Sequence, residues 1–362
     1  MPEGVERYNA METAMDVLES GREMKPHELL ARGPDRLIVR VNSISYQGDG
    51  LNEYELIDPD GRDLPEFTAG SHVDLYFRDG RVRQYSLCNN PRERHRYKVV
   101  VQRESAGRGG SKAIFERVHV GRLLVISRPR NNFPLRPAKR HLLVGGGIGI
   151  TPLMSMLYAL DADGQEFELH YCTRSASSTA FLRELRPFVE RGLANLRHDG
   201  GDPAKGIPLA TLLACHTEGT HVYYCGPPGF MRAVAAAAAH WPSEACHHES
   251  FSTAGHDLAG ARRASDGVEI LDQAISVGFQ IRIASTGMSI EVPNDKSILE
   301  VLREHGIDVP TSCEAGLCGT CRVRYVRGVP DHRDYILEDD EKKEVLLVCC
   351  SRSLSPELVL DL

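Results

Sequence analysis

The sequence has no run of eighteen or more consecutive apolar residues, which argues against a membrane-spanning helix. It also has no excess of positive charge, since 43 Lys and Arg stand against 50 Asp and Glu. A net charge of −7 disfavours nucleic acid as a partner, because phosphates require a basic surface. The first ten residues carry Glu3, Glu6 and Arg7 without an apolar core, so we expect no secretory signal. Ten cysteines without such a signal favour a cytoplasmic location, where clustered cysteines are metal ligands or reactive thiols more often than disulfides.

The pattern of apolar residues changes along the 362 residues, which is enough chain for two or three domains. Residues 1–33 are polar and are expected to be a packed or frayed extension. In residues 34–136, short alternating apolar runs are separated by glycine-rich turns, which predicts a small antiparallel β-barrel. In residues 137–252, short buried strands alternate with helices, which predicts a parallel sheet covered on both faces.

The C-terminal part of the chain is expected to form a separate unit. Residues 253–276 are rich in Gly and Ser and poor in apolar side chains, so we interpret them as an interdomain linker. Residues 277–362 begin with an alternating hairpin pattern, followed by a helix that Ser297 would cap.

Four cysteines of this last unit have the most specific spacing in the chain. Cys313, Cys318 and Cys321 follow a C-x4-C-x2-C pattern, and Cys349 comes after a long gap; plant-type two-iron two-sulfur clusters have this ligand spacing. A structural zinc site is the alternative, but zinc ligands usually come as two C-x2–4-C pairs, and no second pair is present. Cys350 could compete with Cys349. On a strand its side chain would point the opposite way, which favours Cys349.

A glycine-rich segment, Val144–Pro152, follows one predicted strand and opens a helix. Its glycines would let the backbone approach a pyrophosphate, and the helix N-terminus would supply positive potential. The spacing is not a strict G-x-G-x-x-G, and such loops also serve as plain tight turns. Cys225-Gly226-Pro227 at a later strand end supports a nucleotide site, since ligands of open parallel sheets bind at the carboxyl ends of strands.

Two elements of the barrel suit an anion or a flat ligand. Arg83 can pair with a phosphate, while Tyr85 can line an aromatic ring and Ser86 can bond its polar edge. Residues 107–111 precede a helical run and would form a second helix N-terminus suited to a phosphate. Each alone would more often be a strand edge or a turn, but together they favour a flavin.

Taken in order, these motifs resemble the ferredoxin reductase superfamily and, more narrowly, the phthalate dioxygenase reductase group, over residues 35–362. The matching segments are the flavin signature Arg83–Ser86, the pyridine-nucleotide loop Gly145–Pro152, the CGP motif Cys225–Pro227, the flavin-stacking segment Glu249–Phe251 and the four cysteines. The resemblance implies a multidomain protein: an antiparallel β-barrel flavin domain, an α/β parallel-sheet NAD domain and an α+β β-grasp ferredoxin domain.

The resemblance also implies the cofactors and the site residues. It favours FMN over FAD, and NADH as the nicotinamide, although Arg174 and Ser175 could accommodate the 2′-phosphate of NADPH. The implied flavin residues are Arg83, Gln84, Tyr85, Ser86, Gly109, Gly110, Ser111 and Phe251. The implied nucleotide residues are Gly146, Gly147, Gly149, Thr151, Thr173, Arg174, Cys225, Gly226 and Pro227. Direct catalytic roles are implied for Ser86, Cys225 and Phe251, although Cys225 could be a buried thiol and Phe251 a plain core aromatic.

The expected function follows from electron counting. A nicotinamide delivers two electrons at once and a two-iron cluster accepts one at a time, so a flavin is needed between them. The chain has no Rieske Cys/His pattern and no 2-His-1-carboxylate set, so oxygen chemistry would take place on another protein. We therefore expect an NADH-dependent reductase of a separate Rieske-type oxygenase for ring hydroxylation or demethylation. A reductase of a cytochrome P450 or another one-electron acceptor is the alternative, and a non-catalytic zinc module is a more distant one.

Overall fold

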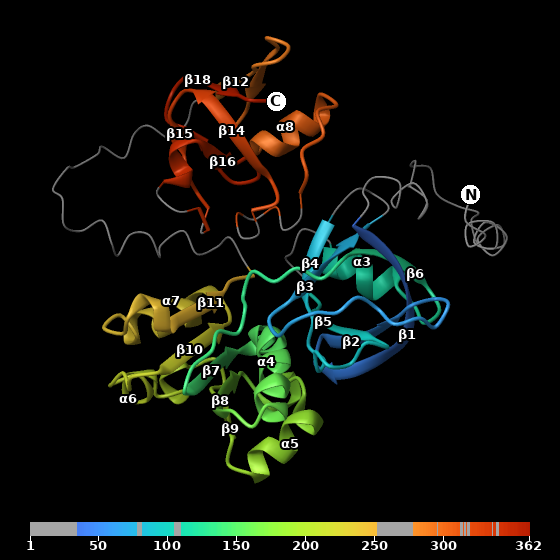
Figure 1. Ribbon diagram of the computed structural model, residues 1–362, viewed down its shortest axis with the longest axis vertical. Helices are drawn as coiled ribbons and strands as arrows, with labels where there is room; N and C mark the ends of the chain where they lie inside the picture. The colour runs from blue at the N-terminus through green and yellow to red at the C-terminus, as the bar shows by residue number, and fades with distance from the viewer. Residues whose placement is uncertain are drawn as a thin grey trace.

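The computed structural model describes residues 35–77, 82–104, 110–251, 278–294, 296–311, 314, 316, 319–334, 336–337 and 340–362. The predicted N-terminal extension and interdomain linker therefore lie outside the described residues. Three bodies are visible in Figure 1: the first domain in blue to cyan, the second in green to yellow beside it, and the third in orange to red above both. In the described residues, no helix has the length and the apolar character needed to cross a membrane.

The first domain is a six-stranded antiparallel sheet with the order β4-β3-β6-β1-β2-β5. Its elements are β1 Arg36–Gly48, β2 Leu51–Ile57, β3 His72–Tyr76, β4 Val82–Ser86, β5 Tyr97–Gln102, α3 Gly110–Arg117 and β6 Leu123–Ser127. The end strands β4 and β5 also contact each other, which closes the sheet into the predicted barrel. Alternation puts Val39, Val41, Val73 and Leu75 inside, where they are almost fully buried.

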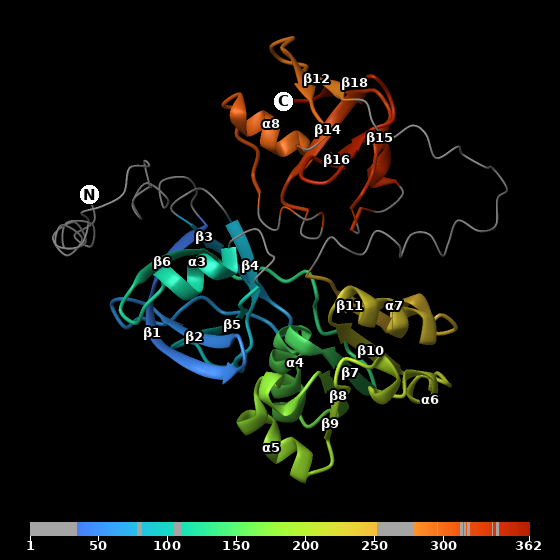
Figure 2. The ribbon, with the colours of Figure 1, turned by 180° about the vertical axis from the view of Figure 1, so that it is seen from behind.

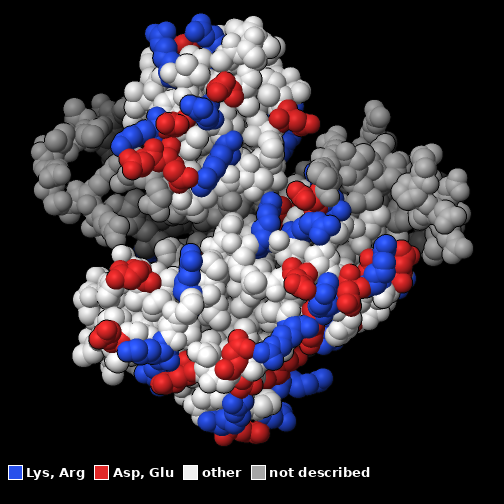
Figure 3. Space-filling model, viewed as in Figure 1, with Lys and Arg blue, Asp and Glu red and all other residues white. Residues whose placement is uncertain are grey.

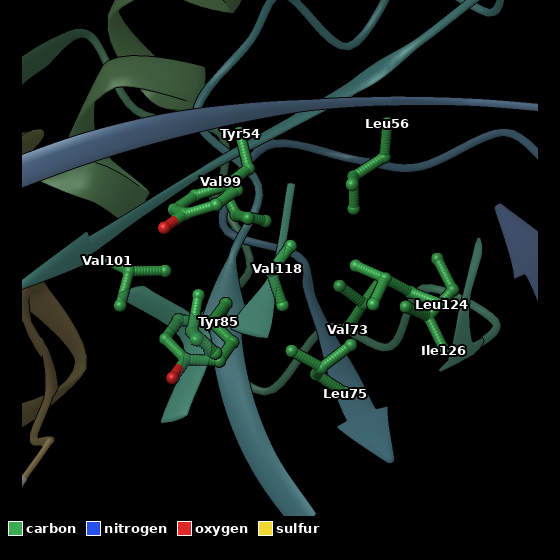
Figure 4. Close-up of a pocket in the computed structure, with 11 residues that line it drawn as sticks. Tyr54, Leu56, Val73, Leu75, Tyr85, Val99, Val101, Val118, Leu124 and Ile126 are labelled. Atoms are coloured by element: carbon green, nitrogen blue, oxygen red, sulfur yellow. The ribbon is translucent and has the colours of Figure 1, made fainter. Parts of the chain in front are cut away.

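The inside of the barrel is filled by side chains. Figure 4 shows aliphatic residues and two tyrosines, Tyr54 and Tyr85, around its centre, and the cavity that they leave has a volume of about 10 Å³. That volume is about the size of one water molecule. The inside of this barrel therefore has no room for an organic cofactor.

The second domain is a five-stranded parallel sheet with the order β11-β10-β7-β8-β9. Its strands are β7 Arg140–Gly146, β8 Glu166–Thr173, β9 Ala194–His198, β10 Thr220–Cys225 and β11 Cys246–Glu249. Its helices are α4 Ile150–Ala162, α5 Leu182–Glu190, α6 Leu209–Leu212 and α7 Pro228–Ala237. The predicted parallel sheet is confirmed, and the short edge strand β11 is an addition that the sequence pattern did not indicate.

Helix α4 joins the two domains. Its buried residues, among them Leu153, Met154 and Met156, pack in one core with Leu143 of the sheet and Phe133 of the segment that leaves the barrel. The buried hydroxyl of Ser155 also accepts a hydrogen bond from the Gly70 N–H at 3.0 Å. Figure 2 shows α4 on the side of the sheet nearest the barrel. A shared core of this kind fixes the position of the sheet against the barrel.

The third domain is a mixed sheet with the order β13-β12-β18-β14-β16 and one helix. Its elements are β12 Phe279–Ile283, β13 Ser289–Val292, α8 Ile298–Glu304, β14 Arg322–Arg327, β15 Pro330–Asp331, β16 Val345–Leu347, β17 Arg352–Ser353 and β18 Glu357–Leu360. The predicted cap is confirmed: Ser297 accepts a bond from the Glu300 N–H at 3.1 Å, and the Glu300 carboxylate accepts one from the Ser297 N–H at 2.7 Å. One face of α8 packs on the sheet through Ile298, Val301 and Leu302.

Candidate functional site

The two glycine motifs of the second domain meet at the centre of its sheet. β7 and β10 are neighbours, and Gly145 pairs with Cys225 at their carboxyl ends. The chain runs from β7 to β8 and β9 on one side and returns to β10 and β11 on the other, so this edge is the topological switch point where such sheets bind ligands.

The backbones at this edge are too close for larger side chains. A Cβ at Gly149 would collide with the carbonyl group of Cys225. A Cβ at Gly226 would lie 3.2 Å from the Gly146 Cα, and the ring of Phe230 covers both positions. Gly147 has a φ of +54° with open space beside it. Two glycines therefore allow close packing and a third allows a left-handed turn. The Ile150 N–H at the start of α4 bonds back to the Gly147 carbonyl, so a ligand would be bound by the N–H groups of the turn at residues 147–149, just before the helix.

A hydroxyl group from the barrel reaches the same edge. Ser86, the last residue of β4, donates a hydrogen bond from Oγ to Glu249 Oε2 at 3.3 Å. Glu249 ends β11 and pairs with Cys225 across the two strands. The predicted residues Ser86 and Cys225 are thus brought together by Glu249, for which the sequence suggested no role.

Burial determines the protonation states of Glu249 and Cys225. It raises the pKa of the Glu249 carboxyl to about 8, while the hydrogen bond from Ser86 acts in the opposite direction. The Cys225 side chain is fully buried, and burial holds the pKa of its thiol well above the usual range. At neutral pH both groups are therefore mainly protonated, and the pair presents a thiol and a carboxylic acid rather than anions.

The outer face of β4 has an unsatisfied polar group. The buried Oε1 of Gln84, two residues before Ser86 on the same face, has no hydrogen-bond partner among the described residues. A buried carbonyl oxygen without a partner is costly, and a bound ligand with an N–H group would satisfy it. The ring of Phe251, just after β11, is 42% exposed and free to cover such a ligand. This face fits the edge and one side of a flavin ring.

Of the other predicted flavin residues, Tyr85 faces the inside of the barrel, and Arg83 and Ser111 do not line that cavity. Tyr85 points into the barrel and lines its small cavity, so most of its ring contacts aliphatic side chains. Arg83 Nη1 donates to the Val82 carbonyl at 2.7 Å and lies 4.0 Å from Glu314 of the third domain. Ser111, in the first turn of α3, accepts a hydrogen bond from the Glu104 N–H at 3.1 Å. Gly110 starts α3, and Gly109 lies outside the described residues.

The predicted ribose residues lie one strand away from the glycine loop. Thr173 ends β8 and is buried, and its hydroxyl group contacts Thr179 Oγ1 at 2.6 Å and His198 Nδ1 at 3.0 Å. Arg174 is exposed. The Thr173 side chain therefore stabilises the loop after β8, and Arg174 is the one of the two that faces solvent.

Two of the four predicted cluster ligands can be described. Cys321 and Cys349 are both buried, and their thiols are within hydrogen-bonding distance of each other. The Gly316 N–H donates to Cys349 Sγ at 3.3 Å, which is the kind of bond that a cluster thiolate accepts. Cys313 and Cys318 lie outside the described residues. No group of three metal-binding side chains comes together within the described part of the chain.

Strand alternation does not distinguish Cys349 from Cys350, so that part of the sequence prediction is wrong. β16 ends at Leu347, and both cysteines belong to the turn that follows, so strand alternation does not separate them. What separates them is hydrogen bonding. Cys349 Sγ accepts from Gly316, whereas Cys350 Sγ donates to the Leu347 carbonyl at 3.7 Å. Cys349 stays the predicted ligand on this different ground.

Comparison with known proteins agrees with this architecture. Residues 143–236 match the oxidoreductase NAD-binding domain family, and residues 281–354 match the 2Fe-2S iron-sulfur cluster binding domain family. The reductase subunit of tert-butanol monooxygenase / tert-amyl alcohol desaturase from Aquincola tertiaricarbonis is 53% identical over 90% of this chain and 96% of its own. Phthalate dioxygenase reductase from Burkholderia cepacia is 42% identical over 85% of this chain and 92% of its own. A solved structure of a phthalate dioxygenase reductase aligns with a TM-score of 0.71 at 40% identity, over 91% of this chain and 98% of that one.

Fold and site together define a modular oxidoreductase in which a barrel, a nicotinamide-binding sheet and a 2Fe-2S domain follow one another in a single chain. The chain belongs to the phthalate dioxygenase reductase-like family. The family and the multidomain fold class that the sequence motifs suggested are confirmed.

Proposed function

We propose that this protein oxidises NADH and passes the electrons through FMN and a 2Fe-2S cluster to a separate Rieske-type oxygenase. The observation that carries the proposal is the meeting of Ser86 with Glu249 and Cys225 where the barrel abuts the carboxyl ends of β10 and β11. A nicotinamide held by the sheet and a flavin held by the barrel would touch at this place. When bound, the flavin takes two electrons as a hydride and releases them singly.

The sheet would bind and orient the nucleotide. The backbone N–H groups of Gly146, Gly147 and Gly149 and the N-terminus of α4 suit a pyrophosphate. The Thr151 hydroxyl donates to the Ile148 carbonyl at 3.1 Å, which stabilises this turn. Cys225, Gly226 and Pro227 would then form the wall beside the nicotinamide ring, and Arg174 would lie near the adenosine ribose.

The barrel would hold the flavin on its outer face. Gln84 and Ser86 would bond the polar edge of the ring, and Phe251 would cover one side until the nicotinamide replaces it. Arg83 and the first turn of α3, with Gly110 and Ser111, suit a single phosphate group. The small set of phosphate-binding groups favours FMN over FAD. The protonated Glu249 would keep this contact region uncharged and limit the entry of water.

The proposed partner is a Rieske-type oxygenase because two relatives are named as reductases of a phthalate dioxygenase and of a tert-butanol monooxygenase. Acidic and basic side chains are interspersed on the face of the molecule in Figure 3, so charge does not single out a docking face in that view. The ten cysteines, several of them buried free thiols, suit a reducing cytoplasm, which is the location that we propose.

The proposal is tested by the composition and the two activities of the protein. Anaerobically purified protein is expected to contain FMN, iron and sulfide, to reduce ferricyanide with NADH, and to prefer NADH over NADPH. The Cys318→Ala variant is expected to lose cytochrome c reduction and to keep ferricyanide reduction, which requires the flavin only. Cys215→Ala is the control, because Cys215 is exposed and outside every proposed site. A colourless protein without flavin or iron, or loss of both activities in folded Cys318→Ala, would contradict the proposal.

The partner is tested separately. Purified reductase is expected to support turnover by a Rieske oxygenase whose gene is adjacent to that of the reductase. If the reductase supports a cytochrome P450 but no Rieske oxygenase, the alternative function, a reductase of a cytochrome P450, would be favoured.

A further inference from the structure

Two residues other than glycine have a left-handed backbone in the described part of the chain: Phe181 with a φ of +62° and Glu314 with a φ of +50°. Side chains adopt this conformation at a cost in free energy, so it persists only where neighbouring groups hold it. In both cases a side chain of the barrel is the neighbour. The Phe181 N–H donates to Gln47 Oε1 at 3.0 Å, and Glu314 Oε2 lies 4.0 Å from Arg83 Nη1.

Glu314 lies between two arginines from different domains. Arg303 of α8, in its own domain, donates from Nη2 to Glu314 Oε1 at 3.0 Å, while Arg83 of β4 faces the other carboxylate oxygen. The Glu314 and Arg83 side chains are only 16% and 18% exposed, so this contact is stronger than an ordinary surface ion pair, while the exposure that remains leaves it sensitive to concentrated salt. Figures 1 and 2 both show β4 at the end of the barrel nearest the third domain.

We propose that Glu314 is a positioning residue that docks the cluster loop on the flavin site through Arg83. The inference rests on the proposed function, in which Cys313, the residue before Glu314, is a cluster ligand and Arg83 contacts the flavin phosphate. A guanidinium group has five N–H donors, so Arg83 can hold a phosphate and a carboxylate together. One arginine would then link flavin occupancy to the position of the cluster. Glu314 itself makes and breaks no covalent bond and carries no electron.

The test compares two steps in one stopped-flow experiment with the flavin- and cluster-loaded protein. In Glu314→Gln, the flavin is expected to be reduced by NADH at the wild-type rate, within about twofold. Subsequent cluster reduction is expected to slow about fivefold, the loss that a partly buried ion pair of this kind predicts for the docked population. Arg303→Gln is the matched control, because it removes the contact within the domain and keeps the one between domains. Its cluster reduction is expected to stay within about twofold of wild type.

Salt supplies a readout that does not depend on a variant. Added KCl is expected to slow cluster reduction in the wild type and to have little effect in Glu314→Gln. If the rate of cluster reduction in the wild type does not change with salt, the inference is overturned. This result needs no variant, so it decides the question even if Glu314→Gln fails to retain its cluster. An Arg303→Gln variant as slow as Glu314→Gln would also overturn it, because Glu314 would then only stabilise its own loop. These outcomes leave the proposed function intact, since that depends on cofactor content and on the two activities of the wild type.

Discussion

The Ser86 hydroxyl donates a hydrogen bond to the Glu249 carboxyl, Oγ to Oε2 at 3.3 Å, across 163 residues of sequence and the boundary between two domains. The bond ties the last residue of β4 to the last residue of β11, beside the buried thiol of Cys225. Since the nicotinamide and the flavin are proposed to meet here, small changes in this group should alter hydride transfer before they alter folding.

Replacing Ser86 by alanine removes the only hydroxyl group of this set. We expect turnover of NADH with ferricyanide to fall about tenfold, the usual consequence of losing one hydrogen bond of about 1.4 kcal/mol in the transition state. The KM for NADH should change less than twofold, because the nucleotide is held elsewhere. Ser127→Ala is the control, since that hydroxyl bonds the Asp74 N–H and the Arg128 carbonyl inside the barrel domain. Wild-type turnover in Ser86→Ala would show that the hydroxyl has no part in the reaction.

Glu249 should make the stability of the flavin-free protein depend on pH. Its pKa is raised to about 8 by burial, against about 4.3 in an unfolded chain. Between these values the folded state keeps a proton that the unfolded state has lost, so the stabilising contribution is complete below about pH 4 and declines as the pH rises toward 8. We expect the free energy of unfolding to fall by about 3 kcal/mol more in wild type than in Glu249→Gln between about pH 5.5 and 8.

Urea unfolding can measure this difference, because Trp241 is the only tryptophan and is buried in the nucleotide domain. Its indole N–H donates to the Leu213 carbonyl at 3.0 Å, so its fluorescence reports the folding of that domain. Equal pH dependence in the two proteins would mean that the Glu249 carboxyl titrates normally.

Gly149 and Gly147 offer a matched pair for the nucleotide loop. Gly149 has an ordinary φ of −63° but no room for a Cβ beside Cys225, while Gly147 has room and a φ of +54°. We expect Gly149→Ala to displace the β7 and β10 strand ends, to destabilise the domain by about 3 kcal/mol and to raise the KM for NADH at least tenfold. Gly147→Ala should lower the free energy of unfolding by only about 1 kcal/mol, because alanine adopts a left-handed backbone at about that cost. Thermal unfolding and steady-state kinetics of both variants would check this, and equal effects would mean that space is not the limiting factor.

The sequence predicted the elements that carry their own local signals. Alternation identified the barrel strands, a buried apolar run identified β7, and Ser297 with its cap marked the start of α8. Cys172 is buried within β8, whereas Cys88 is buried two residues after the end of β4, and burial raises the pKa of both thiols. In each case the information lies within a few neighbouring residues.

What the sequence missed depends on contacts between distant segments. The four residues of β11 have no apolar alternation, and only pairing with β10 makes them a strand. Glu249 belongs to the sequence motif Glu249–Phe251, but the sequence indicates no role for it, because nothing near it in sequence shows that Ser86 lies beside it. The choice between Cys349 and Cys350 was argued from strand alternation, which failed because β16 ends after three residues.

That choice can be settled by exchanging the two cysteines one at a time. A cluster ligand is a thiolate, which accepts hydrogen bonds, and Cys349 Sγ already accepts one from the Gly316 N–H, whereas Cys350 Sγ donates to the Leu347 carbonyl. Cys349→Ser is therefore expected to lose most of its bound iron and visible cluster absorbance, and Cys350→Ser to keep both. The reverse pattern would assign Cys350 as the ligand. Partial cluster content in Cys349→Ser that disappears in the double variant would mean that Cys350 can take the place of Cys349, since the Sγ atoms of both cysteines lie beside Gly316.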